Sequence, residues 1–149
     1  AVAALNAVFE RTAVTKKLVQ DRADELDGKS IPDQTPTLRR WFGDEDTAER
    51  RACENWLQEM SPAAYSSAYS AFASSLIPDR QGLANISCPA LFMTGSKEPN
   101  STPDMSRAMA ELAPSGRAVV VEGAAHMMPM THHQAVNRAL TALIEEVTP

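Results

Sequence analysis

The feature that most constrains the fold of this chain is a change of pattern near Cys88. Before this residue apolar side chains recur at helical spacing, whereas after it short uninterrupted apolar runs alternate with helical stripes. The runs at residues 90–93 and 118–121 are typical of strands that are buried on both faces of a sheet. Strand, loop, helix, strand, loop, helix is the order of parallel α/β sheets, so the sequence predicts an α/β fold with flanking helices.

The same change divides the chain into two predicted regions. Residues 1–80 are expected to form a helical cap or lid region, in which Leu5, Val8 and Phe9 begin one helix or two. Residues 81–149 are expected to form a strand–helix–strand–helix part of an α/β core. A capping box beginning at Thr131 predicts the start of the last helix.

Composition excludes several classes of function. The chain has 149 residues, 19 acidic against 14 basic side chains, a net charge of −5 and no basic run, so we predict no nucleic-acid partner. No apolar stretch approaches the roughly 18 residues of a membrane span, and we predict no membrane partner. The two cysteines form no CxxC pair, which is consistent with a reducing cytoplasm.

Two loops hold the candidate catalytic residues. Open parallel sheets place ligand-handling residues beyond the carboxyl ends of their strands. Glu98 lies in the loop after the first predicted strand, and His126 lies in the loop after the second. A carboxylate bonded to one imidazole nitrogen fixes the tautomer and leaves the other nitrogen as a general base, so the sequence predicts two members of a hydrolytic triad.

At these residues the sequence resembles the α/β-hydrolase superfamily, most of all its enol-lactone hydrolase and haloperoxidase-like members. The C-terminal half of that family runs as Cys/Val-Pro, an apolar strand, Gly-x-x-acid, Thr-Pro, a helix, a second strand and Gly-x-x-His. The matching segments here are Cys88-Pro89, Gly95-Ser96-Lys97-Glu98, Thr102-Pro103 and Gly123-Ala124-Ala125-His126. The helical stretch before Cys88 is similar to the family's cap.

The resemblance implies a Ser–acid–His triad in which His126 is the base and Glu98 the acid. The family's acid is usually Asp, and Asp104 is an alternative nearby. The Gly-x-Ser-x-Gly motif that carries the family's nucleophile does not occur in this sequence. The chain therefore resembles the C-terminal half of a hydrolase of esters or lactones, without cofactor, and is expected to be inactive alone.

Other interpretations stay open. Within the superfamily the same base could serve a dehalogenase or a carbon–carbon hydrolase, and outside it the chain could be a non-catalytic binding module. The two predicted strands need a partner for their open edge, either the N-terminal half of the fold or another copy of the chain.

The roles of several further side chains can be interpreted in two ways. Trp41, Trp56 and Met127 are predicted to contact substrate, although an aromatic stripe at helical spacing is also typical of core packing. His132 and His133 have no helical metal-ligand spacing with His126, so we predict no metal site.

Overall fold

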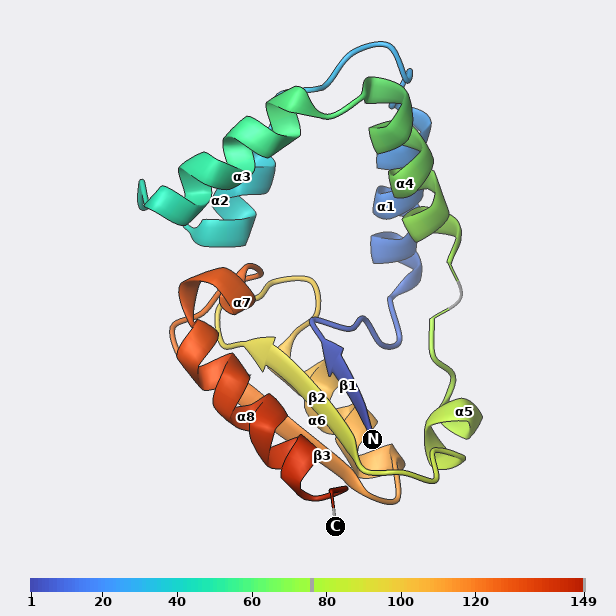
Figure 1. Cartoon of the computed structure of the whole chain (residues 1–149). Helices are drawn as coiled ribbons and strands as arrows, with labels where there is room; N and C mark the ends of the chain where they lie inside the picture. The colour runs from blue at the N-terminus through green and yellow to red at the C-terminus, as the bar shows by residue number, and fades with distance from the viewer. Residues whose placement is uncertain (76, 149) are drawn as a thin grey trace. The chain divides into compact units, whose positions relative to one another are not determined.

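The computed structural model describes residues 1–75 and 77–148 and contains a three-stranded parallel sheet (Figure 1). In chain order the elements are β1 (Val2–Leu5), α1 (Ala13–Asp24), α2 (Thr35–Phe42), α3 (Ala48–Glu59), α4 (Pro62–Ser74), α5 (Arg80–Ala84), β2 (Ala90–Gly95), α6 (Pro103–Leu112), β3 (Gly116–Val121), α7 (Met128–Thr131) and α8 (His133–Glu145). The strand order is β1-β2-β3, so β2 is the central strand of the three. This confirms the predicted α/β class with a parallel sheet and flanking helices.

The first strand was not predicted. Residues 5–9 were expected to begin a helix, but Val2 to Leu5 form β1, which pairs in parallel with β2 in the register Val2↔Ala90 to Leu5↔Met93. The helical expectation is wrong: Leu5 ends a strand whose conformation is decided by pairing nearly ninety residues later in the sequence, and residues 6–9 are not helical. The first helix, α1, begins only at Ala13, where Thr12 caps it by accepting a hydrogen bond from the Thr15 N–H.

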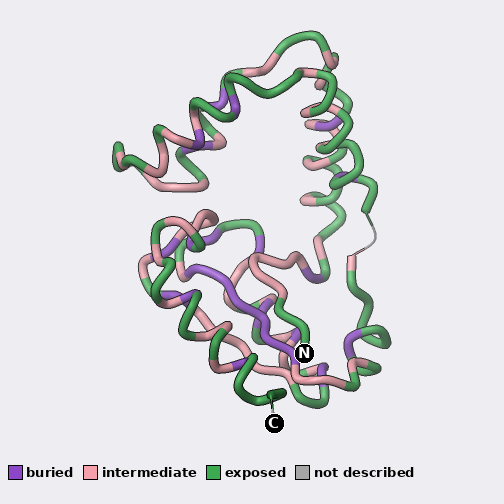
Figure 2. The backbone as a smooth tube through the Cα atoms, in the orientation of Figure 1, coloured by how far each residue is buried: buried purple, intermediate pink, exposed green. Residues whose placement is uncertain are grey.

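The central strand is buried along its whole length, as the purple trace of β2 in Figure 2 shows. Its side chains pack alternately into two apolar clusters, one on each face of the sheet. Leu91 and Met93 pack with residues of α8, whereas Ala90 and Phe92 pack with residues of α6. Successive side chains of a strand point to opposite faces of the sheet, and helices cover both faces of β2. Every residue of the strand is therefore buried, and this requires an uninterrupted apolar run.

The last helix begins differently from the prediction. Thr131 was expected to cap it through a capping box, but Thr131 closes the short helix α7, and its hydroxyl donates to the carbonyl of Met127 at 3.2 Å. Helix α8 begins at His133 with His132 at the N-cap position and no side-chain cap. The capping-box prediction is therefore wrong, because Thr131 is the last residue of α7 and His132, not Thr131, is at the N-cap position of α8.

The chain divides into two compact units. The first consists of Ala1–Glu10, Arg40–Gly43 and Ile77–Pro149, and the second of Arg11–Arg39 and Asp44–Leu76. The first unit holds the three strands, and we call it the sheet unit. Residues 1–10 and 40–43 belong to it, whereas the sequence analysis placed them in the cap region of residues 1–80.

The second unit is helical. Within it, α1 packs against α4, and the hydroxyl of Ser66 on α4 donates to the carbonyl of Leu26 at 3.2 Å. Helix α3 buries Cys53 and Leu57. Among the helices of both units that the structure describes, none is long and apolar enough to cross a membrane.

Candidate active site

The two loops singled out in the sequence meet at the carboxyl edge of the sheet. The Oε2 atom of Glu98, in the loop after β2, lies 2.8 Å from Nδ1 of His126, in the loop after β3. The Glu98 side chain is completely buried, whereas the His126 side chain is 35% exposed. The acid is thus enclosed while the imidazole remains accessible. We call these two residues the acid–base pair.

Three hydrogen bonds keep Glu98 ionised. Burial by itself raises the pKa of Glu98, but this effect is outweighed by the hydrogen bond from His126 and by the backbone N–H groups of Asn100 and Ser101, so the pKa lies below its usual range. Those N–H groups donate to Oε1 at 2.8 and 3.3 Å. Because a carboxylate only accepts hydrogen bonds, the Nδ1 atom of the neutral His126 ring must carry the proton. The Nε2 atom is then the nitrogen that can take a proton from another group.

The two loops are also joined through their backbones. The N–H of Lys97 donates to the carbonyl of Ala124 at 2.9 Å, and the N–H of Ser96 donates to the carbonyl of Val121 at 2.9 Å. The loops approach so closely that a Cβ added to Gly95 would lie 2.2 Å from the oxygen of Ala124. Glycine is therefore required at Gly95 for space.

The alternative acid lies elsewhere. Asp104 is in the first turn of α6, where its side chain is 92% exposed and pairs with Arg107 at 2.8 Å. The structure therefore brings Glu98, and not Asp104, into hydrogen-bonding contact with His126.

The predicted substrate contacts separate into two groups. The ring of Trp41 stacks on the imidazole of His126, with 5.7 Å between centroids and 20° between the planes, and its carbonyl accepts from the N–H of Met127 at 3.2 Å. Trp41 and Met127 thus belong to the surroundings of His126. Trp56 is in the second unit on α3, where it is 58% exposed. The substrate-binding roles of all three stay predictions.

The remaining histidines do not assemble with His126. The Nδ1 of His132 lies 2.9 Å from the Thr131 hydroxyl, and the Nδ1 of His133 lies 3.4 Å from the Met130 carbonyl. Within residues 1–75 and 77–148, the structure contains no group of three or more His, Cys, Asp or Glu placed to hold a metal.

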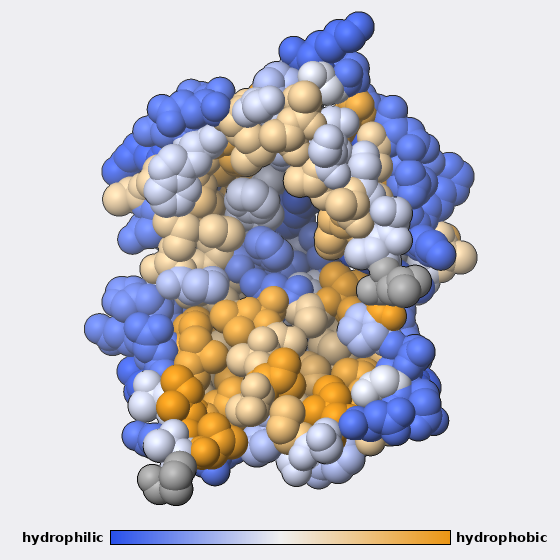
Figure 3. All heavy atoms as spheres, turned by 45° about the vertical axis from the view of Figure 1, so that its right-hand side comes forward, coloured by the Kyte–Doolittle hydropathy of each residue, from blue (hydrophilic) through white to orange (hydrophobic). Residues whose placement is uncertain are grey.

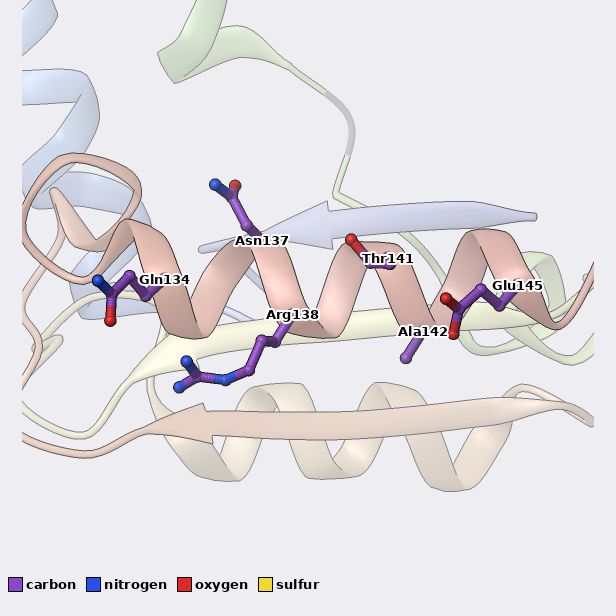
Figure 4. Close-up of a pocket in the computed structure, with 6 residues that line it drawn as sticks. All are labelled: Gln134, Asn137, Arg138, Thr141, Ala142 and Glu145. Atoms are coloured by element: carbon purple, nitrogen blue, oxygen red, sulfur yellow. The ribbon is translucent and has the colours of Figure 1, made fainter.

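A separate hollow of about 420 Å³ runs along α8 (Figure 4). Its lining comes entirely from that helix: Gln134, Asn137, Arg138, Thr141, Ala142 and Glu145. A hollow lined by one helix is a groove on the protein surface, and it contains none of the predicted site residues.

Two polar residues near the pair were missed in the sequence. Asn6, just after β1, donates from Nδ2 to the carbonyl of His126 at 2.6 Å, and Thr94 in β2 contacts Asn6 through its hydroxyl. The sequence feature that points to Asn6 is its place directly after the short apolar stretch at residues 2–5. This feature indicates a site residue only if the stretch is a strand, and the sequence analysis expected no strand there.

Solved structures share this arrangement of strands and helices. A thermophilic esterase from Thermogutta terrifontis, determined with malate bound, superposes with a TM-score of 0.80 at 20% identity over 99% of this chain and 56% of its own. The enol-lactonase from Burkholderia xenovorans LB400 gives a TM-score of 0.71 at 17% identity over 96% of this chain and 55% of its own. At these identities the likeness establishes the fold.

Sequence comparisons establish the family. A curated relative, the (E)-2-((N-methylformamido)methylene)succinate hydrolase of Acinetobacter baylyi, is 38% identical over 147 residues, which are 97% of this chain and 55% of that protein. The chain thus spans about half the length of the relatives it matches. The model of the alpha/beta hydrolase family matches residues 3–139. This match covers most of the chain and confirms the resemblance to the family that the sequence analysis described. The chain therefore belongs to the alpha/beta hydrolase family.

Proposed function

We propose that this chain is the C-terminal half of a hydrolase of esters or lactones and that it supplies the acid and the base of a Ser–acid–His triad. The observation that carries the proposal is the 2.8 Å contact between a buried, ionised Glu98 and the Nδ1 atom of a partly exposed His126. This geometry fixes the tautomer that a general base needs and leaves Nε2 to act.

In the proposed reaction a serine hydroxyl attacks the carbonyl carbon of the substrate while Nε2 of His126 takes the serine proton. His126 then gives this proton to the alcohol oxygen of the substrate as the bond from the carbonyl carbon to that oxygen breaks, and an acyl-enzyme remains. A water molecule next attacks the acyl carbon while His126 takes its proton, and His126 returns that proton to the serine oxygen as the carboxylic acid is released. Glu98 keeps the ring oriented throughout and stabilises the imidazolium while it exists. No cofactor is required for this sequence of steps.

The serine of the proposed triad comes from a segment outside these 149 residues, because the sequence contains no Gly-x-Ser-x-Gly motif. Two features support a polypeptide partner. Among the described residues β1 pairs with β2 alone, so its other edge is open to a further strand. The sheet unit also exposes Val2, Ile144 and Val147, and Figure 3 shows hydrophobic side chains gathered on one of its faces.

The names of the relatives suggest which compounds to test. One is named for the hydrolysis of a methylenesuccinate derivative, one is an enol-lactonase, and one is an esterase with malate bound. We propose a small ester or lactone as substrate, with the compound that names the Acinetobacter relative as a further candidate.

The proposal can be tested with a chimaera in which the part of the Acinetobacter relative that this chain does not match is joined to this chain. We expect hydrolysis of an ester, a lactone or the relative's named compound. The His126→Gln variant should lower the rate by about 10²–10⁴-fold, because that is the usual contribution of general acid–base catalysis. Exposed His133 is the matched control, and His133→Gln should leave the rate unchanged.

Two results would contradict the proposal. Activity that survives His126→Gln would exclude this residue as the base. A folded chimaera that binds these compounds without converting them would favour the non-catalytic binding module, and release of halide or cleavage of a carbon–carbon bond would favour the other hydrolase classes.

A further inference from the structure

Asn6 has a conformation and a set of contacts that the roles of Glu98 and His126 do not explain. It directly follows β1, its φ is +51°, and its N–H donates to the carbonyl of Met93 at 2.8 Å. Asparagine is one of the few residues that adopt such a φ readily. This backbone places the Asn6 side chain at the carboxyl edge of the sheet, where it donates to the backbone of His126.

The orientation of the Asn6 amide follows from its partners. The carbonyl of His126 can only accept, so the group 2.6 Å from it must be the Nδ2 amine of Asn6. The Oδ1 atom of the amide then lies 3.1 Å from the hydroxyl of Thr94. Thr94 is fully buried, and its hydroxyl is also 2.6 Å from the carbonyl of Ser101. Its single proton is donated to one of these two oxygens at a time.

These contacts close a ring of hydrogen bonds that includes the acid–base pair. Ser101, whose carbonyl contacts Thr94, also donates its N–H to Glu98. Glu98 is hydrogen-bonded to His126, whose carbonyl accepts a hydrogen bond from the amide of Asn6. The ring thus runs through the end of β1, the end of β2 and both loops, and Asn6 is the member that connects the backbone of the base to the other two strands.

We propose that Asn6 is a positioning residue that holds the backbone of His126 at the distance at which Nδ1 reaches Glu98. The inference rests on the proposed function, since it concerns the same base. Without the amide, the turn that carries His126 loses its tie to β1, and the imidazole gains freedom to leave the carboxylate. The proton on Nδ1 then exchanges with water more often, and the neutral ring populates the other tautomer.

The test uses imidazole ¹H–¹⁵N spectra of the full chain, in which His126 is assigned from the His126→Gln variant. The Asn6→Gly variant removes the amide while keeping a residue that tolerates the positive φ. We expect the Nδ1 proton of His126 to exchange with water about tenfold faster, because one hydrogen bond is lost from the ring. Thr94→Val, which releases the other end of the amide, should act in the same direction with a smaller effect.

A matched control separates positioning from general destabilisation. Asn137→Gly lowers the helix propensity of α8 at an exposed position and should leave the His126 spectrum as in the wild type. The inference is overturned if Asn6→Gly and Thr94→Val leave both the exchange rate and the tautomer unchanged. It is also overturned if Asn137→Gly alters them as much as Asn6→Gly does.

The same spectra distinguish this inference from the proposed function. If the neutral His126 ring of the wild type carries its proton on Nε2, the proposed function fails and the inference fails with it. If the wild type carries the proton on Nδ1, loses it from that position in Glu98→Gln and keeps it there with the wild-type exchange rate in Asn6→Gly, the pairing stands and only the role of Asn6 is wrong.

Discussion

Replacing Gly95 by Ala should disturb both the fold and the acid–base pair. The added Cβ would lie 2.2 Å from the oxygen and 2.6 Å from the carbonyl carbon of Ala124, and 3.0 Å from the oxygen of Ala125. These are backbone atoms, so no side-chain rotation relieves the contact. To lengthen the shortest contact from 2.2 to 3.0 Å, the strand and the turn must separate by roughly 0.8 Å.

Two magnitudes follow from this displacement. Overpacking of a well-packed core costs about 1–3 kcal/mol, so we expect the free energy of unfolding to fall by that amount. The turn that moves carries His126, and a misplacement of about 1 Å in an active site can cost roughly 10²-fold in rate. The chimaera that carries Gly95→Ala should therefore lose about 10²-fold of its hydrolytic rate while remaining folded.

Gly116→Ala is the matched control. A Cβ on Gly116 would lie 2.3 Å from the oxygen of Ala110, which is a clash of the same kind, but Gly116 begins β3 at the end of the sheet opposite the pair. Urea unfolding can follow the fluorescence of Trp41 in a Trp56→Phe background, because Trp41 belongs to the sheet unit. Both variants should lose similar stability, and only Gly95→Ala should broaden or shift the His126 signals.

Either of two results would contradict the expected effect of Gly95→Ala. Gly95→Ala with the stability of the wild type would mean that the close approach of the two loops does not require glycine. Equal disturbance of His126 in the Gly95 and Gly116 variants would mean that the effect on the pair is only a consequence of lost stability.

Three further changes should separate the contributions of the site and of the helical unit. Because the pKa of Glu98 is lowered in the folded state, its stabilising contribution is present above the unfolded-state pKa and is lost as the pH falls through the folded-state pKa; acid titration of unfolding should therefore show a steeper loss in the wild type than in Glu98→Gln. Trp41→Leu removes the ring stacked on His126 and should lower the rate of the chimaera by up to about tenfold, as steady-state assays would show. Thr47→Ala removes the cap that accepts from the N–H of Arg50 at 3.2 Å and should cost about 1 kcal/mol in urea unfolding, with no change at His126.

The sequence predicted the part of the fold whose signals are local. The apolar runs at residues 90–93 and 118–121 became β2 and β3, because a strand covered on both faces needs an uninterrupted apolar run. The helix expected after Thr102-Pro103 is α6, and Thr102 caps it by accepting from the N–H of Met105. The proximity of Glu98 and His126 followed from placing each after a parallel strand of one sheet.

What the sequence did not predict depends on contacts between distant segments. β1 has four residues, two of them Ala, and its identity as a strand comes from pairing with β2. Since Asn6 follows that strand, its role could not be recognised until the strand was. Gly95 was read as part of a family motif, whereas its close contact with Ala124 depends on how the two loops pack.

The acid–base pair is thus assembled inside the sheet unit. The partners that keep Glu98 ionised, the backbone bonds between its loop and the loop of His126, and the amide of Asn6 all come from residues of that unit. We expect a pair built in this way to keep its geometry whether or not a nucleophile is present, because Glu98 and His126 are held by hydrogen bonds from the sheet unit itself. The proposed partner segment would then have only two tasks, to deliver a serine within reach of Nε2 and to complete the surface that selects the substrate. Measuring the tautomer of His126 before and after addition of such a segment would decide this point: an unchanged tautomer is expected, and a ring that adopts the Nδ1–H form only with the partner would show that the pair is completed by binding.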